Sequence, residues 1–126
     1  MKPYIHAVNS VRKYGGKVED YQAVHDFFDS SKAHVPDIRH RALLHSSFGI
    51  FMVEQVFGTT ITNSDGKVIS VRDLGEDHVI EDMGFIPTVD KWLNNIPIND
   101  WMWGAKRGKL KKHVDFNDIT PKRHDD

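Results

Sequence analysis

The sequence predicts a mainly α-helical fold: a compact bundle of about five helices around a long central helix at 37–57, with one small antiparallel β-hairpin at 59–71. Three observations predict this fold. Apolar residues recur at helical spacing in several segments, glycine or proline ends most of these segments, and an Asp-Gly pair separates two β-prone runs. The 126 residues suffice for one domain with its own core.

The first helix is expected over residues 4–14. Its apolar stripe consists of Tyr4, Ala7, Val8, Val11 and Tyr14. This stripe leaves His6 and Ser10 on the roughly opposite side. Gly15 follows the last apolar residue, as is typical of a helix end.

The second helix is expected over residues 19–31. Glu19 and Asp20 suit its N-terminus because acidic side chains interact favourably with the helix dipole there. Its apolar face places His25 at the edge and Asp26 on the polar side.

The central helix is expected to run from Asp37, a suitable N-cap, to Gly58. Its apolar residues go nearly all the way round, which indicates a buried helix. One narrow polar stripe remains, at intervals of seven: His40, Ser47 and Glu54.

The hairpin at 59–71 turns at Asp65-Gly66. Two short helices are expected after it, over 75–83, closed by Gly84, and over 88–95. Residues 1–100 are therefore expected to form one helical domain, and residues 101–126 a basic and then acidic C-terminal tail that is weakly ordered.

Composition narrows the possible functions. The absence of cysteine excludes disulfides, thiolate metal sites and a cysteine nucleophile. No apolar run reaches the roughly 18 residues that a membrane span needs, and the N-terminus lacks a signal-peptide core, so we expect a cytoplasmic protein without membrane contact. With a net charge of −1, the whole protein has no strong field for nucleic acid. Eight histidines point instead to metal ligation or proton transfer.

The clearest local pattern is the segment from His78 to Asp82. His78, Glu81 and Asp82 have the helical spacing that puts side chains on one face, within reach of one ion. An ordinary solvated face has the same spacing. His40, on the polar stripe of a buried helix, needs a polar partner, either a ligand or a structural hydrogen bond.

The sequence thus predicts a divalent-metal site, for zinc, manganese or iron, whose ligands come from three helices. The best ligand candidates are His6, His40, His78 and Asp82. A second group is held in reserve: His45, Glu54, Glu81, His25 and Asp26. Periodicity alone does not tell how the helices dock, so the convergence of these residues is a prediction.

The tail also carries a basic run: Lys106, Arg107, Lys109, Lys111 and Lys112. Such a run can contact phosphates, and Trp101 and Trp103 before it could stack on bases. The aspartates that follow dilute its charge, so a solvated tail is the alternative.

The order His6, His25-Asp26 and Asp82 resembles the metal signature of the HD phosphohydrolase superfamily. That resemblance implies an all-helical fold that cleaves phosphate esters with divalent ions.

A second resemblance covers residues 4–95. Its motifs, in chain order, are His6 with Gly15-Gly16, Asp20-Tyr21, His25-Asp26, Ser31-Lys32, Arg39-His40-Arg41 with His45, Gly49-Ile50-Phe51 with Glu54, Phe57-Gly58, Asn63-Ser64-Asp65-Gly66, Val71-Arg72, Glu76 with His78, Glu81-Asp82 with Gly84, Ile86-Pro87 and Trp92. Together they resemble a family of small uncharacterised proteins, a domain of unknown function, found in bacteriophages and prophage-bearing bacteria. The resemblance implies a phage setting and the host cytoplasm, and says little of activity.

Two functions follow as hypotheses. The first is a metal-dependent hydrolase of a phosphate ester or nucleotide, built on the His and carboxylate ligands. The second is a non-catalytic module that binds a host or defence protein, for which we expect an exposed aromatic patch around Trp101 and Trp103 and no converging histidines.

Overall fold

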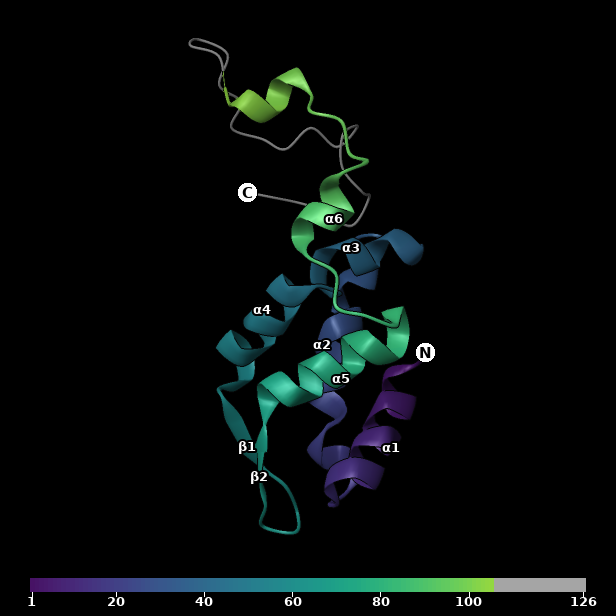
Figure 1. The fold of residues 1–126 in the computed structure, drawn as a ribbon, viewed down its shortest axis with the longest axis vertical. Helices are drawn as coiled ribbons and strands as arrows, with labels where there is room; N and C mark the ends of the chain where they lie inside the picture. Colours follow the sequence, from purple (N-terminus) through teal and green to yellow (C-terminus); the bar gives the residue numbers. More distant parts are fainter. Residues whose placement is uncertain (106–126) are drawn as a thin grey trace.

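The computed structural model describes residues 1–105 and confirms the mainly helical fold class. Within these residues it contains six α-helices, several short 3-10 turns and one two-stranded antiparallel sheet. The helices surround one apolar core, and the hairpin lies at the end of the body away from α6 (Figure 1).

The first helix, α1, spans Pro3–Tyr14, close to the prediction. It turns a different face inward than its apolar stripe indicates. His6, Ala7 and Ser10 are its buried residues, whereas Tyr4 is 57% exposed. The polar side of α1 therefore faces the core, which can happen only where neighbouring helices offer polar partners.

The second helix, α2, spans Gln22–Asp29 and lies between two 3-10 turns, Val18–Asp20 and Ser30–Ala33. Its buried residues are Val24, His25 and Phe28.

The prediction of one continuous central helix at 37–57 is wrong. The segment instead contains a 3-10 turn at Ile38–His40, α3 at Arg41–Leu44, and α4 at Ser47–Phe57. The chain turns extended at Ser46, whose hydroxyl caps α4 by accepting from the backbone N–H of Gly49 at 3.3 Å.

Gly49 is what allows this break. A Cβ at position 49 would stand 1.6 Å from the carbonyl oxygen of Leu44, so the backbone of α3 passes directly over the first turn of α4. The break turns the side chain of His45 inward, where it is fully buried.

The hairpin is confirmed, with β1 at Thr60–Thr62 paired antiparallel to β2 at Val68–Ser70. The next helix, α5, spans Val71–Met83 and starts earlier than the predicted 75–83. Ser70 sets that start, because its hydroxyl accepts from the backbone N–H of Asp73 at 3.1 Å.

The short helix α6 spans Val89–Leu93, and a 3-10 turn follows at Asp100–Trp103. Helix α6 packs against α3, and the turn at Asp100–Trp103 lies beyond it, away from the main body (Figure 1). The predicted domain limit at residue 100 and the tail at 101–126 stay predictions, since residues 106–126 lie outside the described part of the chain.

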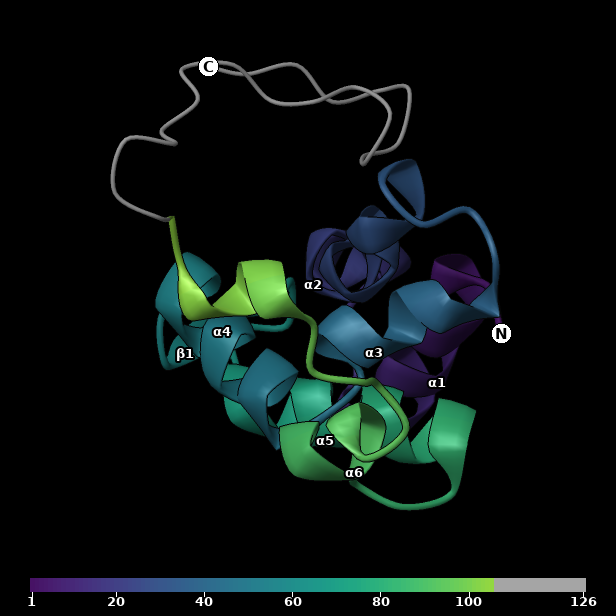
Figure 2. The ribbon, with the colours of Figure 1, turned by 90° about the horizontal axis from the view of Figure 1, so that it is seen from above.

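Helix α5 lies against α2 and α4, and α1 packs beside α2 (Figures 1 and 2). Gly75 permits the close crossing, since a Cβ there would lie 3.2 Å from Phe28 Cζ and from Val53 Cγ1. The polar face of α5 thereby meets the polar faces of α1 and α2 inside the core. Within residues 1–105, none of the helices combines the length and apolar character needed to cross a bilayer.

Candidate metal centre

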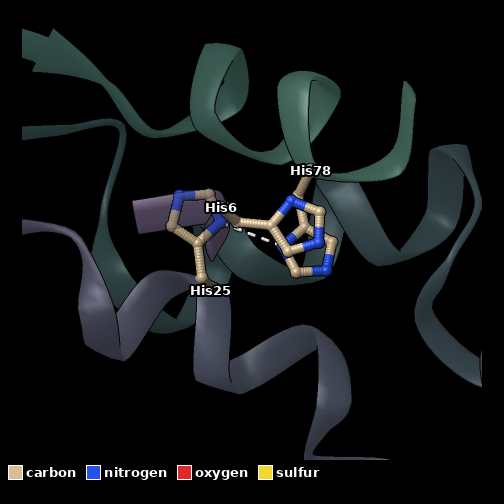
Figure 3. A group of neighbouring side chains, drawn as sticks. All are labelled: His6, His25 and His78. Carbon is tan, nitrogen blue, oxygen red and sulfur yellow. Dashed lines mark hydrogen bonds between the residues drawn. The ribbon is translucent and has the colours of Figure 1, made fainter. Parts of the chain in front are cut away.

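Three imidazoles from three helices meet in the interior: His6 of α1, His25 of α2 and His78 of α5 (Figure 3). We call them the histidine triad. Each offers one nitrogen within 4.8 Å of the others. The Nδ1 atoms of His25 and His78 lie 2.9 Å apart, within hydrogen-bond distance. All three side chains are at most 1% exposed.

A second group lies next to the triad and shares His78 with it. This group, the ligand set, consists of Asp29, His45, His78 and Asp82, which each offer one ligand atom within 4.8 Å of the others. Asp82 Oδ2 lies 2.9 Å from His45 Nε2 and 3.3 Å from His78 Nε2. His45 Nε2 lies 3.9 Å from Asp29 Oδ1.

These spacings suit a metal ion. Ligand atoms that bind an ion at about 2.1 Å in a tetrahedron stand about 3.4 Å apart. The three distances of 2.9, 3.3 and 3.9 Å scatter around that value. Two imidazoles and two carboxylates are also a donor set that zinc, manganese and iron accept.

Asp82 is the electrostatic centre of the site. Its side chain is 1% exposed, and its Oδ1 lies 3.1 Å from His6 Nε2, 3.3 Å from the Met1 amino group and 3.8 Å from Arg41. Burial alone would raise the pKa of this carboxyl, but hydrogen bonds from His45 and His6 and the nearby charge of His6 hold that pKa far below its usual range. Asp82 is therefore a carboxylate at any ordinary pH.

His6 differs from the other buried histidines. Its Nδ1 lies 2.7 Å from Glu81 Oε1 and its Nε2 lies 3.1 Å from Asp82 Oδ1, so both nitrogens face carboxylates. Burial lowers the pKa of His6, but these hydrogen bonds outweigh it and the pKa is raised. Its ring stacks on His78 at 3.7 Å between centroids, so the in-plane lone pairs of the two rings do not converge. His6 thus suits an imidazolium that balances Asp82 better than a ligand.

His25 and His78 are held neutral. Burial, together with the neighbouring histidines, lowers the pKa of His25 to about 3. Burial also lowers the pKa of His78 to about 4, against the opposing effect of Asp82. Neutral imidazole is the form that binds metal ions.

Two buried ring nitrogens have no hydrogen-bond partner among residues 1–105: His78 Nε2 and His45 Nδ1. His78 Nε2 faces the Asp82 carboxylate at 3.3 Å, outside hydrogen-bond geometry. A buried nitrogen without a partner is costly, so this atom needs an explanation.

A cavity of about 290 Å³ opens beside the ligand set. Asp29, 11% exposed, lies at its wall and connects the two. Lys2, Lys32 and Arg41 line it together with Asp29 and Asp37, so basic side chains outnumber carboxylates on its wall. The ligand set can therefore be reached from solvent on the side of Asp29.

The structure brings together three of the four preferred ligand candidates, His6, His78 and Asp82. The fourth, His40, is buried and lies beside His45 at 5.8 Å between ring centroids, but its Nδ1 bonds to the Ser31 hydroxyl at 2.9 Å. His40 therefore has the structural hydrogen bond that the sequence left open.

The reserve candidates divide into two groups. His25 belongs to the histidine triad and His45 to the ligand set, and Glu81, 26% exposed, lies beside the triad, bonded to His6. Asp26 is exposed and accepts from Gln22 Nε2 at 2.9 Å, and Glu54 lines a separate surface cavity. The His25-Asp26 pair of the HD-type signature therefore does not point into one site.

Asp29 is the ligand candidate that the sequence reasoning missed. It stands four residues after His25, the same spacing that singled out His78 and Asp82. That spacing was the available signal. The basic residues Lys106, Arg107, Lys109, Lys111 and Lys112 lie outside the described residues.

Comparison with known families adds one match. Residues 1–102 match the family described as Domain of unknown function (DUF6915). The chain belongs to this family. The match spans every helix described above, so the buried cluster lies wholly within the DUF6915 region. No curated protein and no solved structure matches the chain.

Proposed function

We propose that this protein binds one divalent metal ion through the ligand set Asp29, His45, His78 and Asp82, and uses it to hydrolyse a phosphate ester or nucleotide. The observation that carries the proposal is His78 Nε2, a buried nitrogen without a hydrogen bond that faces a carboxylate. A cation between these groups satisfies the nitrogen and both aspartates at once.

Charge agrees with this assignment. The two carboxylates of the ligand set can neutralise a divalent ion, and the His6 imidazolium beside them is shared between Asp82 and Glu81. Asp29 and Asp82 both approach the imidazoles of the ligand set, so a cation placed there attracts both carboxylates.

The cavity supports an anionic substrate. Once Asp29 binds the ion, Lys32, which lies 3.6 Å from Asp29, is free to contact a phosphate together with Lys2 and Arg41. A bound divalent ion supplies Lewis acidity that polarises a phosphoryl oxygen. The hydrolase proposal does not depend on the HD-type resemblance, because Asp26 lies outside the cluster.

Metal content tests the binding. We expect purified protein to hold close to one zinc, manganese or iron ion per chain and to melt at a lower temperature after chelation. Asp26→Asn is the matched control and should keep the ion. Substoichiometric metal, with a melting temperature unchanged by chelator, removes the proposal.

Hydrolysis is tested separately with p-nitrophenyl phosphate and nucleoside monophosphates. We expect turnover that is lost in Asp29→Asn and weakened in Lys32→Ala, with a raised KM in the latter. A filled metal site without turnover on any phosphate ester removes the hydrolase part and leaves the metal binding.

One observation favours the interaction module as a second candidate. Trp101 and Trp103 are 75% and 81% exposed, and Ile98 beside them is 75% exposed. Such apolar exposure is typical of a protein-binding surface. The convergence of the histidines speaks against a purely non-catalytic module, because that hypothesis predicts none.

A co-purification experiment separates the two candidates. For the module, in the phage or prophage setting that the family resemblance implies, a host protein should co-purify at equal stoichiometry in the cytoplasmic fraction. It should be lost in the Trp101→Ala, Trp103→Ala double variant and kept in Asp82→Asn. Loss only in Asp82→Asn would assign the partner to the metal site instead.

A further inference from the structure

Behind His78, on the side away from the ligand set, lies a buried series of hydrogen bonds. His78 Nδ1 meets His25 Nδ1 at 2.9 Å, and His25 Nε2 meets the Ser10 hydroxyl at 2.8 Å. The Ser10 hydroxyl donates to the backbone carbonyl of His6 at 3.2 Å. The series joins α5, α2 and α1, and Figure 3 shows its first link as the dashed line.

The carbonyl at its end sets the direction of every proton in the series. A carbonyl only accepts, so the single hydroxyl proton of Ser10 is used there, and Ser10 Oγ must accept from His25 Nε2–H. Neutral His25 then has its lone pair on Nδ1, which accepts from His78 Nδ1–H. Neutral His78 is left with its lone pair on Nε2, the atom that faces Asp82 and His45.

The reverse direction fits the geometry less well. It would point the Ser10 proton at His25 and place the proton of His78 on Nε2. That Nε2–H would be buried without an acceptor in hydrogen-bond geometry among residues 1–105. It would also leave the 3.2 Å contact between Ser10 and the His6 carbonyl without a proton.

We propose that Ser10 and His25 are positioning residues that keep the proton of His78 on Nδ1 and so present the lone pair of Nε2 to the metal ion. The role of the ion rests on the proposed function, but the tautomer of His78 does not. Partners of this kind hold a ligating imidazole in orientation and tautomer, and their loss typically weakens metal affinity about 10- to 100-fold.

The low pKa values of His25, about 3, and His78, about 4, agree with this assignment, because each ring then carries a single proton at neutral pH. His6 lies beside both rings, but its two nitrogens are engaged by Glu81 and Asp82 and do not interrupt the series.

The direct test is the tautomer. Long-range ¹H–¹⁵N spectra of the full protein after chelation should show His78 protonated on Nδ1 and His25 protonated on Nε2. Assignment of either ring to the opposite tautomer overturns the proposal. This measurement needs no bound ion, so it stays decisive even if the protein binds no metal.

The variants test the consequence. We expect Ser10→Ala to weaken zinc affinity about 10- to 100-fold and to populate the Nε2–H tautomer of His78. Ser10→Thr, which keeps the hydroxyl, should restore both properties.

Ser31→Ala is the matched control, since the Ser31 hydroxyl likewise contacts a buried histidine ring, that of His40 at 2.9 Å, and a backbone carbonyl, here that of His40 itself at 3.0 Å. It should leave zinc affinity and the His78 tautomer unchanged. An equal loss of affinity in Ser10→Ala and Ser31→Ala would show a merely structural effect and overturn the proposal. Absent zinc binding in the unmodified protein would instead overturn the proposed function and leave the tautomer result standing.

Discussion

Helices α2 and α5 each carry a histidine and an aspartate four residues apart, and the two pairs do different things. On α5, His78 and Asp82 both face the ligand set, and Asp82 is 1% exposed. On α2, His25 points past the ligand set to support His78, while Asp29 lies at its edge, 11% exposed, beside the cavity. Spacing therefore puts two side chains on one face, but the depth and tilt of the helix decide which of them reaches an ion.

The difference has an electrostatic consequence. The α5 pair is surrounded by His6, His45 and Arg41, so its carboxylate is compensated from several sides. The α2 pair has fewer charged neighbours among residues 1–105, where Asp29 lies 3.6 Å from Lys32 and 3.9 Å from His45. Removing charge from α5 should therefore damage the fold, whereas removing it from α2 should mainly damage the site.

The largest effect is expected for Asp82→Asn. The change removes the charge that compensates the His6 imidazolium, the Met1 amino group and Arg41. Metal binding should therefore be lost and the free energy of unfolding should fall by about 3 kcal/mol. Urea denaturation and metal analysis measure the two effects. Asp29→Asn should lose the ion with less than about 1 kcal/mol of destabilisation. Equal destabilisation by both substitutions would contradict the comparison.

The second-largest loss of stability is expected for Gly49→Ala. The new Cβ would meet the Leu44 carbonyl, so α3 and α4 must move apart. We expect a loss of about 2 kcal/mol in unfolding free energy and weaker metal binding, since His45 follows Leu44 directly. Ser47→Ala, an exposed position in the same turn, is the control and should change neither quantity. A fully stable Gly49→Ala protein would mean that the break does not need glycine.

Acid should destabilise the metal-free protein. The folded pKa values of His25 and His78, about 3 and 4, lie below their ordinary value of 6.5, so the unfolded chain binds more protons between these limits. Stability is therefore full above pH 6.5 and falls as the pH drops toward 4. His6, whose pKa is raised, acts in the opposite direction, but it is one group against these two and His40, whose pKa is also lowered by burial. We expect the melting temperature to fall by roughly 5 °C or more from pH 7 to pH 5.

The groups that face His78 are His6, His25, His45 and Asp82, and the carboxyl of Asp82 stays ionised throughout this window. His25→Asn should flatten the acid dependence, whereas His34→Gln, an exposed position, should not. A melting temperature that rises toward pH 5 would contradict the neutral state of the two rings.

The smallest effect is expected for Asp26→Asn. Asp26 neighbours His25 in sequence, but it is exposed and bonds only to Gln22 among the described residues. The unfolding free energy should change by less than about 0.5 kcal/mol, and metal content should stay unchanged. Loss of the ion in this variant would show that Asp26 contributes to the metal site and would support the HD-type arrangement.

Much of the fold could be predicted from the sequence because its signals are local. The Asp-Gly turn fixes the hairpin, and glycines end α1, α4 and α5 close to the predicted positions. The break in the predicted central helix was missed because Ser46 and Gly49 are ordinary helical residues by periodicity. Only the tertiary approach of Leu44 to Gly49 shows that the helix must end.

The site was predicted in part for a related reason. A helical wheel counts histidine as polar and places His6 outside, whereas the fold buries it against Glu81 and Asp82. His40 was preferred as a ligand and His45 was held in reserve, but the break at Ser46 turns His45 inward and makes it the ligand candidate. The four-residue spacing from His25 was a sequence signal for Asp29, but its partners in the ligand set lie 16 and more residues away, so only the packing of α2 beside α5 shows that it joins them.

Trp92 gives the buried site an optical consequence. Its indole Nε1–H donates to the backbone carbonyl of His45 at 2.8 Å, so the fluorophore is hydrogen-bonded to the peptide unit of a ligand candidate. Any displacement of His45 when an ion arrives alters the hydrogen bond and polarity around that indole. The other two tryptophans, at 101 and 103, stand in solvent and contribute a constant background. The protein therefore carries its own emission probe for the state of its core.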